Sequence, residues 1–259
     1  MEKYELDSLK EKASIGNEEA IISLSNYYLQ NRREDMAYLT AQKLEFISSK
    51  KGYKYIASFY MKGIGTDINL KKAKSLYSKS LALGDIDSGY NLALIAINEN
   101  DLLLAKHYID SGINKDHIPS IKLLASLYSK GEIVEKDDDK VIDLLKKAIE
   151  LGDKSSAESL AKLYYAKADY EKAFKYFSIG ADLKNLDSIY HLGLCYAKGL
   201  GVKQDFNLAR KYYEIGANLF EPRCLYNLSL YYRNGTTISK NVELANKLEA
   251  QAIERGFKK

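Results

Sequence analysis

Residues 192–216 decide the fold, and their sequence is LGLCYAKGLGVKQDFNLARKYYEIG. A leucine and a glycine at positions 192 and 193 are followed one helical turn later by Tyr196. Ala209 and Tyr213 repeat this pairing of a small and a large residue further along. Apolar residues at such spacings share one face of a helix. Because glycines and an aspartate separate the two segments, the stretch predicts two helices joined by a turn.

The same pattern recurs along the whole chain. An aliphatic residue followed by a small one occurs seven times, at spacings that alternate between 32 and 36 residues: Leu24-Ser25, Ile56-Ala57, Leu92-Ala93, Leu124-Ala125, Leu160-Ala161, Leu192-Gly193 and Leu228-Ser229. A second column follows 13 or 17 residues later and marks a second helix in each unit: Ala37, Ala73, Ala105, Val141, Ala173, Ala209 and Ala245. One such unit cannot bury its apolar face, whereas stacked units form a continuous core. We therefore predict an all-α fold, an α-solenoid of seven helix-turn-helix repeats.

Residues that begin and end helices support this division. Glycines in the turns of the long units are predicted to be left-handed, at Gly63, Gly131, Gly199 and Gly235. Capping residues stand four positions before the second column, at Asn69, Asp101, Asp137, Asp169, Asp205 and Asn241, and only Arg33 departs from this rule. Gly16, Gly84 and Gly152 end second helices. The other junctions carry Ser48, Asp116, Lys184 and Phe220, so we expect different turns there.

No linker or low-complexity tract interrupts the repeats, so we expect one elongated domain over residues 1–259. Residues 1–11 are predicted to form an N-terminal cap helix. The seven repeats occupy residues 12–251 and start near positions 12, 44, 80, 112, 148, 180 and 216. Residues 252–259 are predicted to be a C-terminal cap fragment. Such caps cover the open faces of terminal repeats.

Composition places the chain among ordinary folded proteins, with 46% apolar and 29% charged residues and a net charge of +4. The N-terminal residues are charged and amphipathic, unlike a signal peptide. The longest apolar run, Leu92 to Ile97, is much shorter than the roughly 20 residues that span a bilayer. We therefore expect a cytoplasmic protein without membrane insertion, or a periplasmic one if a signal peptide had been removed.

The long units, such as YHLGLCYAKGLGVKQDFNLARKYYEIGA and YIASFYMKGIGTDINLKKAKSLYSKSLALGD, resemble Sel1-like repeats of the tetratricopeptide superfamily. The short units, such as LAKLYYAKADYEKAFKYFSIG, are more similar to tetratricopeptide repeats themselves. The resemblance implies a right-handed superhelix whose first helices line a concave groove. It also implies a non-enzymatic bacterial adaptor or scaffold that binds a protein or peptide. An immunity protein that neutralises a secreted toxin is the alternative.

Residues that could carry catalysis or bind metal do not converge in the sequence. Cys195 and Cys224 occupy unlike positions in adjacent first helices, offset by about 10 Å along the axis, so we predict two reduced packing residues rather than a disulfide. His107, His117 and His191 belong to different units, and neither cysteine has a histidine at the spacing of a zinc site. We expect no catalytic residue, metal or cofactor.

Three local patterns have structural explanations that we favour. The Gly-x-Gly pairs at 63–65 and 199–201 follow helices and lack the Lys-Ser/Thr pair of a phosphate loop, so helix capping is expected. The run Asp137 to Asp139 lacks the glycine and distal glutamate of a calcium loop. Lys71, Lys72 and Lys74 form a basic cluster, but the net charge is small for a nucleic-acid binder. Enzymatic and nucleic-acid functions are therefore remote alternatives.

The groove residues are expected two positions before and two after each Leu-small pair, with some one turn further on. The predicted partner-binding residues are Lys54, Tyr90, Leu94, Lys122, Glu158, Lys162, Tyr190, Leu194, Lys198, Tyr226, Leu230 and Arg233. Tyr190, Leu194, Tyr226, Leu230 and Arg233 form a predicted anchor patch, and Lys54, Lys122 and Lys162 a steering row. Lysines around aromatic anchors suit a partner with acidic groups. Alternatively, the lysines only solvate an exposed face.

Overall fold

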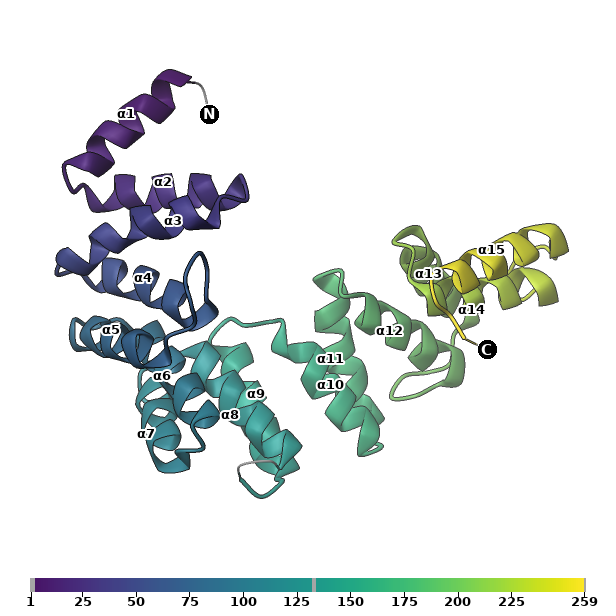
Figure 1. The fold of residues 1–259 in the computed structure, drawn as a ribbon. Helices are drawn as coiled ribbons and strands as arrows, with labels where there is room; N and C mark the ends of the chain where they lie inside the picture. Colours follow the sequence, from purple (N-terminus) through teal and green to yellow (C-terminus); the bar gives the residue numbers. More distant parts are fainter. Residues whose placement is uncertain (1–2, 132–133, 259) are drawn as a thin grey trace. The chain divides into compact units, whose positions relative to one another are not determined.

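The structure is a computed structural model that describes residues 3–131 and 134–258. Within these residues the chain contains fifteen α-helices, one 3₁₀ helix and no strand (Figure 1). Contacts group the chain into two compact units, Met1–Leu123 and Leu124–Lys259. The predicted all-α solenoid of helix pairs is confirmed, whereas the single domain remains a prediction.

The helices of the first unit follow the predicted repeats. α1 precedes three helix pairs, and α8 contains the boundary between the units. The bounds are α1 (Lys3–Ser14), α2 (Glu18–Gln30), α3 (Glu34–Ala41), η1 (Gln42–Phe46), α4 (Lys50–Lys62), α5 (Leu70–Ala82), α6 (Ile86–Asn98), α7 (Leu102–Ile113) and α8 (Ile118–Lys130).

The second unit continues the alternation of first and second helices. Its helices are α9 (Asp138–Glu150), α10 (Ser156–Ala166), α11 (Tyr170–Asp182), α12 (Leu186–Lys198), α13 (Phe206–Asn218), α14 (Pro222–Asn234) and α15 (Val242–Glu254). Within each unit, the first helices α2, α4, α6, α10, α12 and α14 each pack against the second helix of their own repeat and against the helix before them (Figure 1). α15 ends at Glu254, inside the segment predicted as the C-terminal cap fragment.

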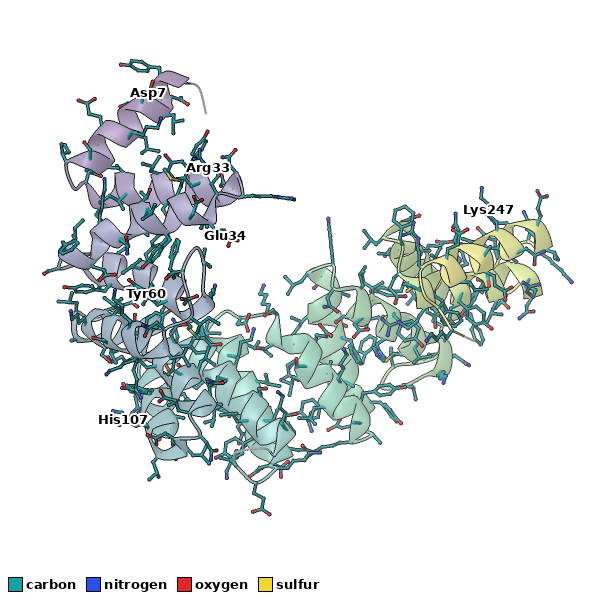
Figure 2. The ribbon with its side chains drawn as sticks, in the orientation of Figure 1. Asp7, Arg33, Glu34, Tyr60, His107 and Lys247 are labelled. Atoms are coloured by element: carbon teal, nitrogen blue, oxygen red, sulfur yellow. The ribbon has the colours of Figure 1, made fainter. Side chains whose placement is uncertain are left out.

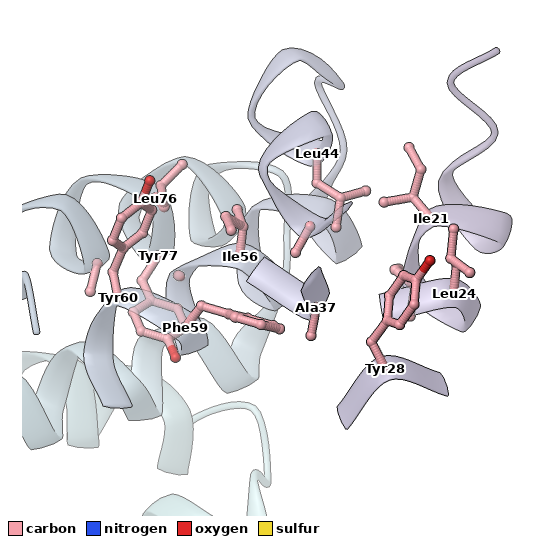
Figure 3. Close-up of a cluster of buried hydrophobic side chains, with 14 of the residues drawn as sticks. Ile21, Leu24, Tyr28, Ala37, Leu44, Ile56, Phe59, Tyr60, Leu76 and Tyr77 are labelled. Carbon is pink, nitrogen blue, oxygen red and sulfur yellow. The ribbon is translucent and has the colours of Figure 1, made fainter. Parts of the chain in front are cut away.

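The two predicted columns form the core of each helix pair. Ile56 and Ala57 are completely buried on α4, and Ala73 of α5 faces them. Figure 3 shows Phe59, Tyr60 and the side chains of α5 filling the space around this crossing. Because alanine lets the two backbones approach, the large residues on either side reach across the interface.

The residues predicted to begin and end the helices do so. Gly63, Gly131, Gly199 and Gly235 are left-handed, with φ between 67° and 72°. All six predicted capping side chains accept a hydrogen bond from a backbone N–H of the following second helix. Arg33, the exception in the sequence, makes no such bond. Local sequence therefore sets where the second helices begin and where the first helices of the long units end.

The expectation for the junctions without glycine was wrong at three of four positions. Asp116, Lys184 and Phe220 are left-handed like the junction glycines, with φ of 54°, 58° and 60°. The conformation lets the N–H of the following residue bond to one of the last carbonyls of the second helix, as Asn185 N does to Gly180 O at 3.1 Å. These bonds offset the ~1–2 kcal/mol that the conformation costs a residue with a Cβ. Only the Ser48 junction differs, because η1 replaces the end of α3.

The second glycine of each Gly-x-Gly pair allows a close backbone contact between repeats. A Cβ on Gly201 would lie 2.0 Å from the carbonyl oxygen of Tyr170, at the start of α11. A Cβ on Gly65 would lie 2.1 Å from the carbonyl oxygen of Glu34, at the start of α3. These loops therefore hold adjacent repeats together, in agreement with the structural explanation favoured from the sequence.

Candidate partner-binding face

The residues predicted for the groove form two columns on the first helices. We call them the −2 and +2 positions, counted from the leucine or isoleucine of the Leu-small pair. The structure gives the two columns different surroundings. Most −2 side chains touch the next repeat, whereas the leucines at +2 positions are half-buried and remain accessible.

Four −2 side chains contact the residue that follows the next left-handed junction residue. The pairs are Lys54 with Asp85 (Nζ to Oδ1, 2.8 Å), Tyr90 with His117 (ring centroids 6.2 Å apart), Glu158 with Asn185 (Oε2 to Nδ2, 2.6 Å), and Tyr226 with Phe257 (ring centroids 4.3 Å apart). The partners follow Gly84, Asp116, Lys184 and Gly256, which all have positive φ. The shared turn geometry therefore directs each partner onto the first helix of the preceding repeat. These four −2 residues contribute to repeat-to-repeat packing.

The +2 column supplies apolar surface. Leu94 on α6, Leu194 on α12 and Leu230 on α14 are each partly exposed. In the second unit, Leu194 and Leu230 occupy equivalent positions on successive first helices, and Tyr190 and Tyr226 lie one turn before them. Four residues of the predicted anchor patch are thus half-buried on α12 and α14.

A chain of alternating charges links the first helices α10, α12 and α14. The Lys162 ammonium bonds to Glu158 on its own helix at 2.6 Å and to Asp187 on α12. Asp187 also accepts a hydrogen bond from Arg223, whose Nε bonds to Glu221 at 2.6 Å. We call these five residues the charge ladder. It holds the carboxylates and cations of three helices in fixed positions.

The ladder also fixes the orientation of Tyr190. The Arg223 guanidinium carbon lies 4.3 Å from the centroid of the Tyr190 ring, within the range of a cation–π interaction. Burial disfavours ionisation of Asp187, but the hydrogen bonds from Lys162 and Arg223 outweigh it and lower the pKa of Asp187. Burial likewise opposes the charge on Lys162, while Asp187 and Glu158 raise the pKa of its ammonium above the ordinary value. Asp187 and Lys162 are therefore both charged at neutral pH.

Ionic contacts also connect the first helices of the first unit. Lys54 bonds to Asp87 at 2.7 Å, and His117 Nε2 lies within hydrogen-bond distance of Asp87 Oδ1, at 3.0 Å. Lys54 chiefly, with His117, lowers the pKa of Asp87. The other ring nitrogen of His117 lies 2.8 Å from Ser120 Oγ. Asp87, His117 and Ser120 together have the composition of a catalytic triad. However, Ser120 is 1% exposed and packs against Gly112, so a substrate cannot reach its hydroxyl.

Three further predicted site residues lie apart from these contacts. Arg233 bonds to Asn246 and Glu249 on α15, the second helix of its own repeat. Lys198 is exposed in the last turn of α12, and Lys122 is exposed on α8. The structure therefore gathers the tyrosines and leucines of the anchor patch on α12 and α14, while Arg233 is held by α15.

The sequence prediction missed Asp87, Asp187 and Arg223, which stand five positions before the leucine of each pair. A signal was present at both ends of this column, which reads Glu19, Lys51, Asp87, Pro119, Ser155, Asp187 and Arg223: the charged residues alternate in sign there, whereas the two middle positions are uncharged. Glu19 on α2 and Lys51 on α4 occupy the same register and bond at 2.8 Å. Opposite charges at equivalent positions of successive repeats are the pattern from which such bonds can be predicted.

The remaining candidates for chemistry have structural roles. Cys195 and Cys224 are buried free thiols, and burial raises the pKa of Cys195 to about 11. His191 stacks on Phe177 with ring centroids 4.5 Å apart, and burial lowers the pKa of its imidazole. His107 is exposed at the periphery of α7 (Figure 2). In the described residues, no group of three or more His, Cys, Asp or Glu side chains is arranged to hold a metal ion.

The acidic run and the basic cluster are also engaged within the chain. Asp137 caps α9, and Asp139 bonds to Lys167 at 2.7 Å. Lys72 donates to the hydroxyl of Tyr60, labelled in Figure 2, at 2.5 Å. Lys74 bonds to Glu99 at 2.6 Å. Most of the charges in the two clusters are therefore paired within the chain.

Comparison with known families agrees with this arrangement of helices. The model of the Sel1 repeat matches residues 52–85, 119–153, 160–185, 186–219 and 222–257, which together make up more than half of the chain. The chain therefore belongs to the Sel1 repeat family. A curated relative, DAP3-binding cell death enhancer 1 of Rattus norvegicus, is 35% identical over 77 residues. That match covers 29% of this chain and 15% of the relative.

Solved structures show the same fold. A protective antigen of uropathogenic Escherichia coli with an SLR fold superposes with a TM-score of 0.67 at 20% identity, covering 97% of this chain and 60% of the antigen. A Sel1 repeat protein of Oxalobacter formigenes has a TM-score of 0.63 at 20% identity, covering 90% and 96% of the two chains. Across residues 3–131 and 134–258, no helix is both long and apolar enough to cross a membrane.

Proposed function

We propose that the protein is a non-enzymatic interaction module, and that the first helices α12 and α14 bind a protein or peptide partner through Tyr190, Leu194, Tyr226 and Leu230. The half-buried leucine and tyrosine positions repeated on these two helices carry the proposal. Half-buried aromatic and aliphatic side chains are already restricted in the unbound protein. They therefore lose little conformational entropy on binding and make good anchors for a partner. The charge ladder beside them keeps Tyr190 in place before binding.

Ion pairs within the chain change which kind of partner we expect. Lys54 and Lys162 of the steering row bond to carboxylates of the chain itself, so much of their charge is neutralised. Charges that are already paired contribute little to long-range steering. We therefore propose a partner that docks mainly through apolar side chains. Acidic groups on the partner would make a smaller contribution than the lysine pattern of the sequence indicates.

Leucine variants test this function most cleanly. Tyr190 packs under Arg223 and Tyr226 against Phe257, so their replacement would also disturb the fold. We propose affinity capture from the native cell, with the wild-type chain and with the double variant Leu194→Asp, Leu230→Asp. We expect the dominant captured protein to be lost, because two carboxylates would be buried against apolar partner surface.

The matched control is Ile215→Asp, which alters a 38% exposed side chain on the second helix α13. It is expected to retain the partner. Equal capture by the double variant and the wild type, with both melting at the same temperature, would place the partner elsewhere. An immunity protein would capture a single toxin in this experiment, and an adaptor several signalling proteins.

A further inference from the structure

A hollow in the second unit is bounded by the helices α13, α14 and α15 and has a volume of about 360 Å³. This volume is within the range of small-molecule sites in proteins. Three leucines and a tyrosine line it on α14 and α15, and two polar residues line it on α13. The six residues are Leu228, Tyr232, Leu244, Leu248, Glu214 and Asn218. The hollow shares no residue with the anchor patch.

Tyr232 belongs to a column of tyrosines that stand four positions after the leucine or isoleucine of each Leu-small pair, with Ala96 as the exception. In five other repeats, a cation or a ring of the same repeat covers the tyrosine ring. The contacts, as distances to the centroid of the tyrosine ring, are Arg33 over Tyr28 (5.3 Å), Lys72 over Tyr60 (4.3 Å), Lys140 over Tyr128 (4.7 Å), Lys172 over Tyr164 (5.2 Å) and Tyr212 stacked on Tyr196 (5.6 Å). Among the described residues, Tyr232 has no such contact.

Two side chains of α15 account for this difference. The covering lysines of other repeats stand one position before the second column, and the stacked tyrosines of α11 and α13 stand three positions after it. In the last repeat these two positions hold Leu244 and Leu248, and both line the hollow. Neither leucine supplies a cation or a flat aromatic face. Because the covering group belongs to the same repeat elsewhere, the hollow follows from the residues of α15 itself.

We propose that this hollow binds a small aromatic amine, with its ring stacked on Tyr232. The preceding repeat supplies the geometry, since Tyr212 stacks on Tyr196 with ring planes 9° apart. Leu244 and Leu248 favour a ring over a bare ammonium, because their side chains offer no acceptor for N–H groups. Stacking on an aromatic face adds to the gain from burying the ring. The inference goes beyond the proposed protein-binding function and does not depend on it.

The polar residues on α13 suit the amine of such a ligand. Glu214 Oε1 accepts a hydrogen bond from Arg210 Nη1 at 2.6 Å. The other oxygen of this carboxylate and the side-chain oxygen of the exposed Asn218 accept no hydrogen bond within the described residues. Both oxygens are acceptors, so an ammonium group on the ligand complements them. A carboxylate on the ligand would instead be repelled by Glu214.

Fluorescence anisotropy of tryptamine tests the proposal, because the chain contains no tryptophan whose emission would interfere. We expect the anisotropy to rise in a saturable way as the full chain is added. In competition, 2-phenylethylamine should displace tryptamine about fivefold more effectively than 2-cyclohexylethylamine, which has the amine but no aromatic face. Indole-3-acetate carries a carboxylate in place of the amine and should bind at least about tenfold more weakly than tryptamine.

The test variants fill the hollow with groups that other repeats use. Leu248→Tyr rebuilds the stack of α11 and α13 and should weaken tryptamine binding at least about tenfold. Leu244→Lys restores the covering lysine and should act in the same direction, which keeps the test valid if one variant is unstable. Leu144→Tyr is the matched control, because it makes the same exchange at the equivalent position of α9, where Lys140 already covers Tyr128. It should bind tryptamine like the wild type.

An anisotropy that does not saturate, or wild-type affinity in both α15 variants, would overturn the site. Equal displacement by the two competing amines would overturn ring stacking. Equal binding of indole-3-acetate and tryptamine would overturn the role of Glu214. None of these outcomes decides the proposed protein-binding function, because the variants leave the anchor patch unchanged.

Discussion

At the scale of single residues, Asp187 is the carboxylate on which the charge ladder depends. Its pKa is lowered, so its stabilising effect is present above the ordinary aspartate value of about 4 and is lost as the pH falls towards the native-state value. Asp187→Asn is expected to reduce the free energy of unfolding by about 1–2 kcal/mol at pH 7, because two cations lose their partner. Urea denaturation at pH 7 and pH 3 measures the difference, which should shrink at the lower pH.

Asp182→Asn provides the control for this prediction. Asp182 is exposed at the end of α11, and the ladder does not include it. Its replacement should change stability by less than about 0.5 kcal/mol at either pH. A deficit in Asp187→Asn that stayed the same from pH 7 to pH 3 would mean that lost packing, rather than lost charge, is responsible.

At the scale of elements, the turn after α12 contains two glycines with different roles: one ends a helix, and the other allows a close contact with the preceding repeat. Gly199 and Gly201 have nearly equal φ, 70° and 69°, but their surroundings differ. A Cβ on Gly199 would meet its nearest neighbour at 3.5 Å, whereas one on Gly201 would overlap the backbone of Tyr170. Gly199→Ala should therefore cost only the left-handed conformation, about 1 kcal/mol. Gly201→Ala should cost at least about 2 kcal/mol more, since the repeats must move apart.

Chemical denaturation of both glycine variants checks this expectation, and each acts as the control for the other. The same comparison at Gly63 and Gly65 applies to the turn after α4, although Ile68 crowds Gly63 more closely there. Equal losses at positions 199 and 201 would show that the contact with α11 can relax without cost.

At the scale of the whole molecule, each repeat contacts only its neighbours. A core substitution should therefore destabilise mainly its own repeat and the adjacent ones. Leu92 and Leu192 are repeat-equivalent and both 1% exposed, but they belong to different units. Replacing either with alanine should cost about 2–5 kcal/mol. Hydrogen exchange should increase mainly in α5–α7 for Leu92→Ala and mainly in α11–α14 for Leu192→Ala, because solenoid stability is a sum of local terms.

Hydrogen exchange followed by mass spectrometry distinguishes the two patterns, and each leucine variant again serves as the control for the other. Uniform acceleration along the whole chain in both variants would contradict local coupling. It would indicate that the two units unfold as one cooperative body.

Much of the fold could be predicted because it depends on local chemistry. Asp205 caps α13 whatever its tertiary surroundings, and Gly199 takes the left-handed conformation that its turn requires. The candidate site was less predictable. Lys162 was predicted to face a partner, but its role depends on Asp187, which lies in the next repeat. Phe220 was expected to change its junction, but the hydrogen bonds of the turn outweigh its residue type.

By itself, the sequence determined the seven helix pairs, their buried columns, the residues that begin the second helices and the glycines that end the first helices of the long units. These features follow from periodicity and from bonds between residues a few positions apart. Only the tertiary structure decided which groove residues remain accessible. Tyr226 meets Phe257, and Lys54 meets Asp85, because stacked repeats bring together residues about 30 positions apart. Such contacts depend on how one helix pair packs on the next, which no local pattern specifies.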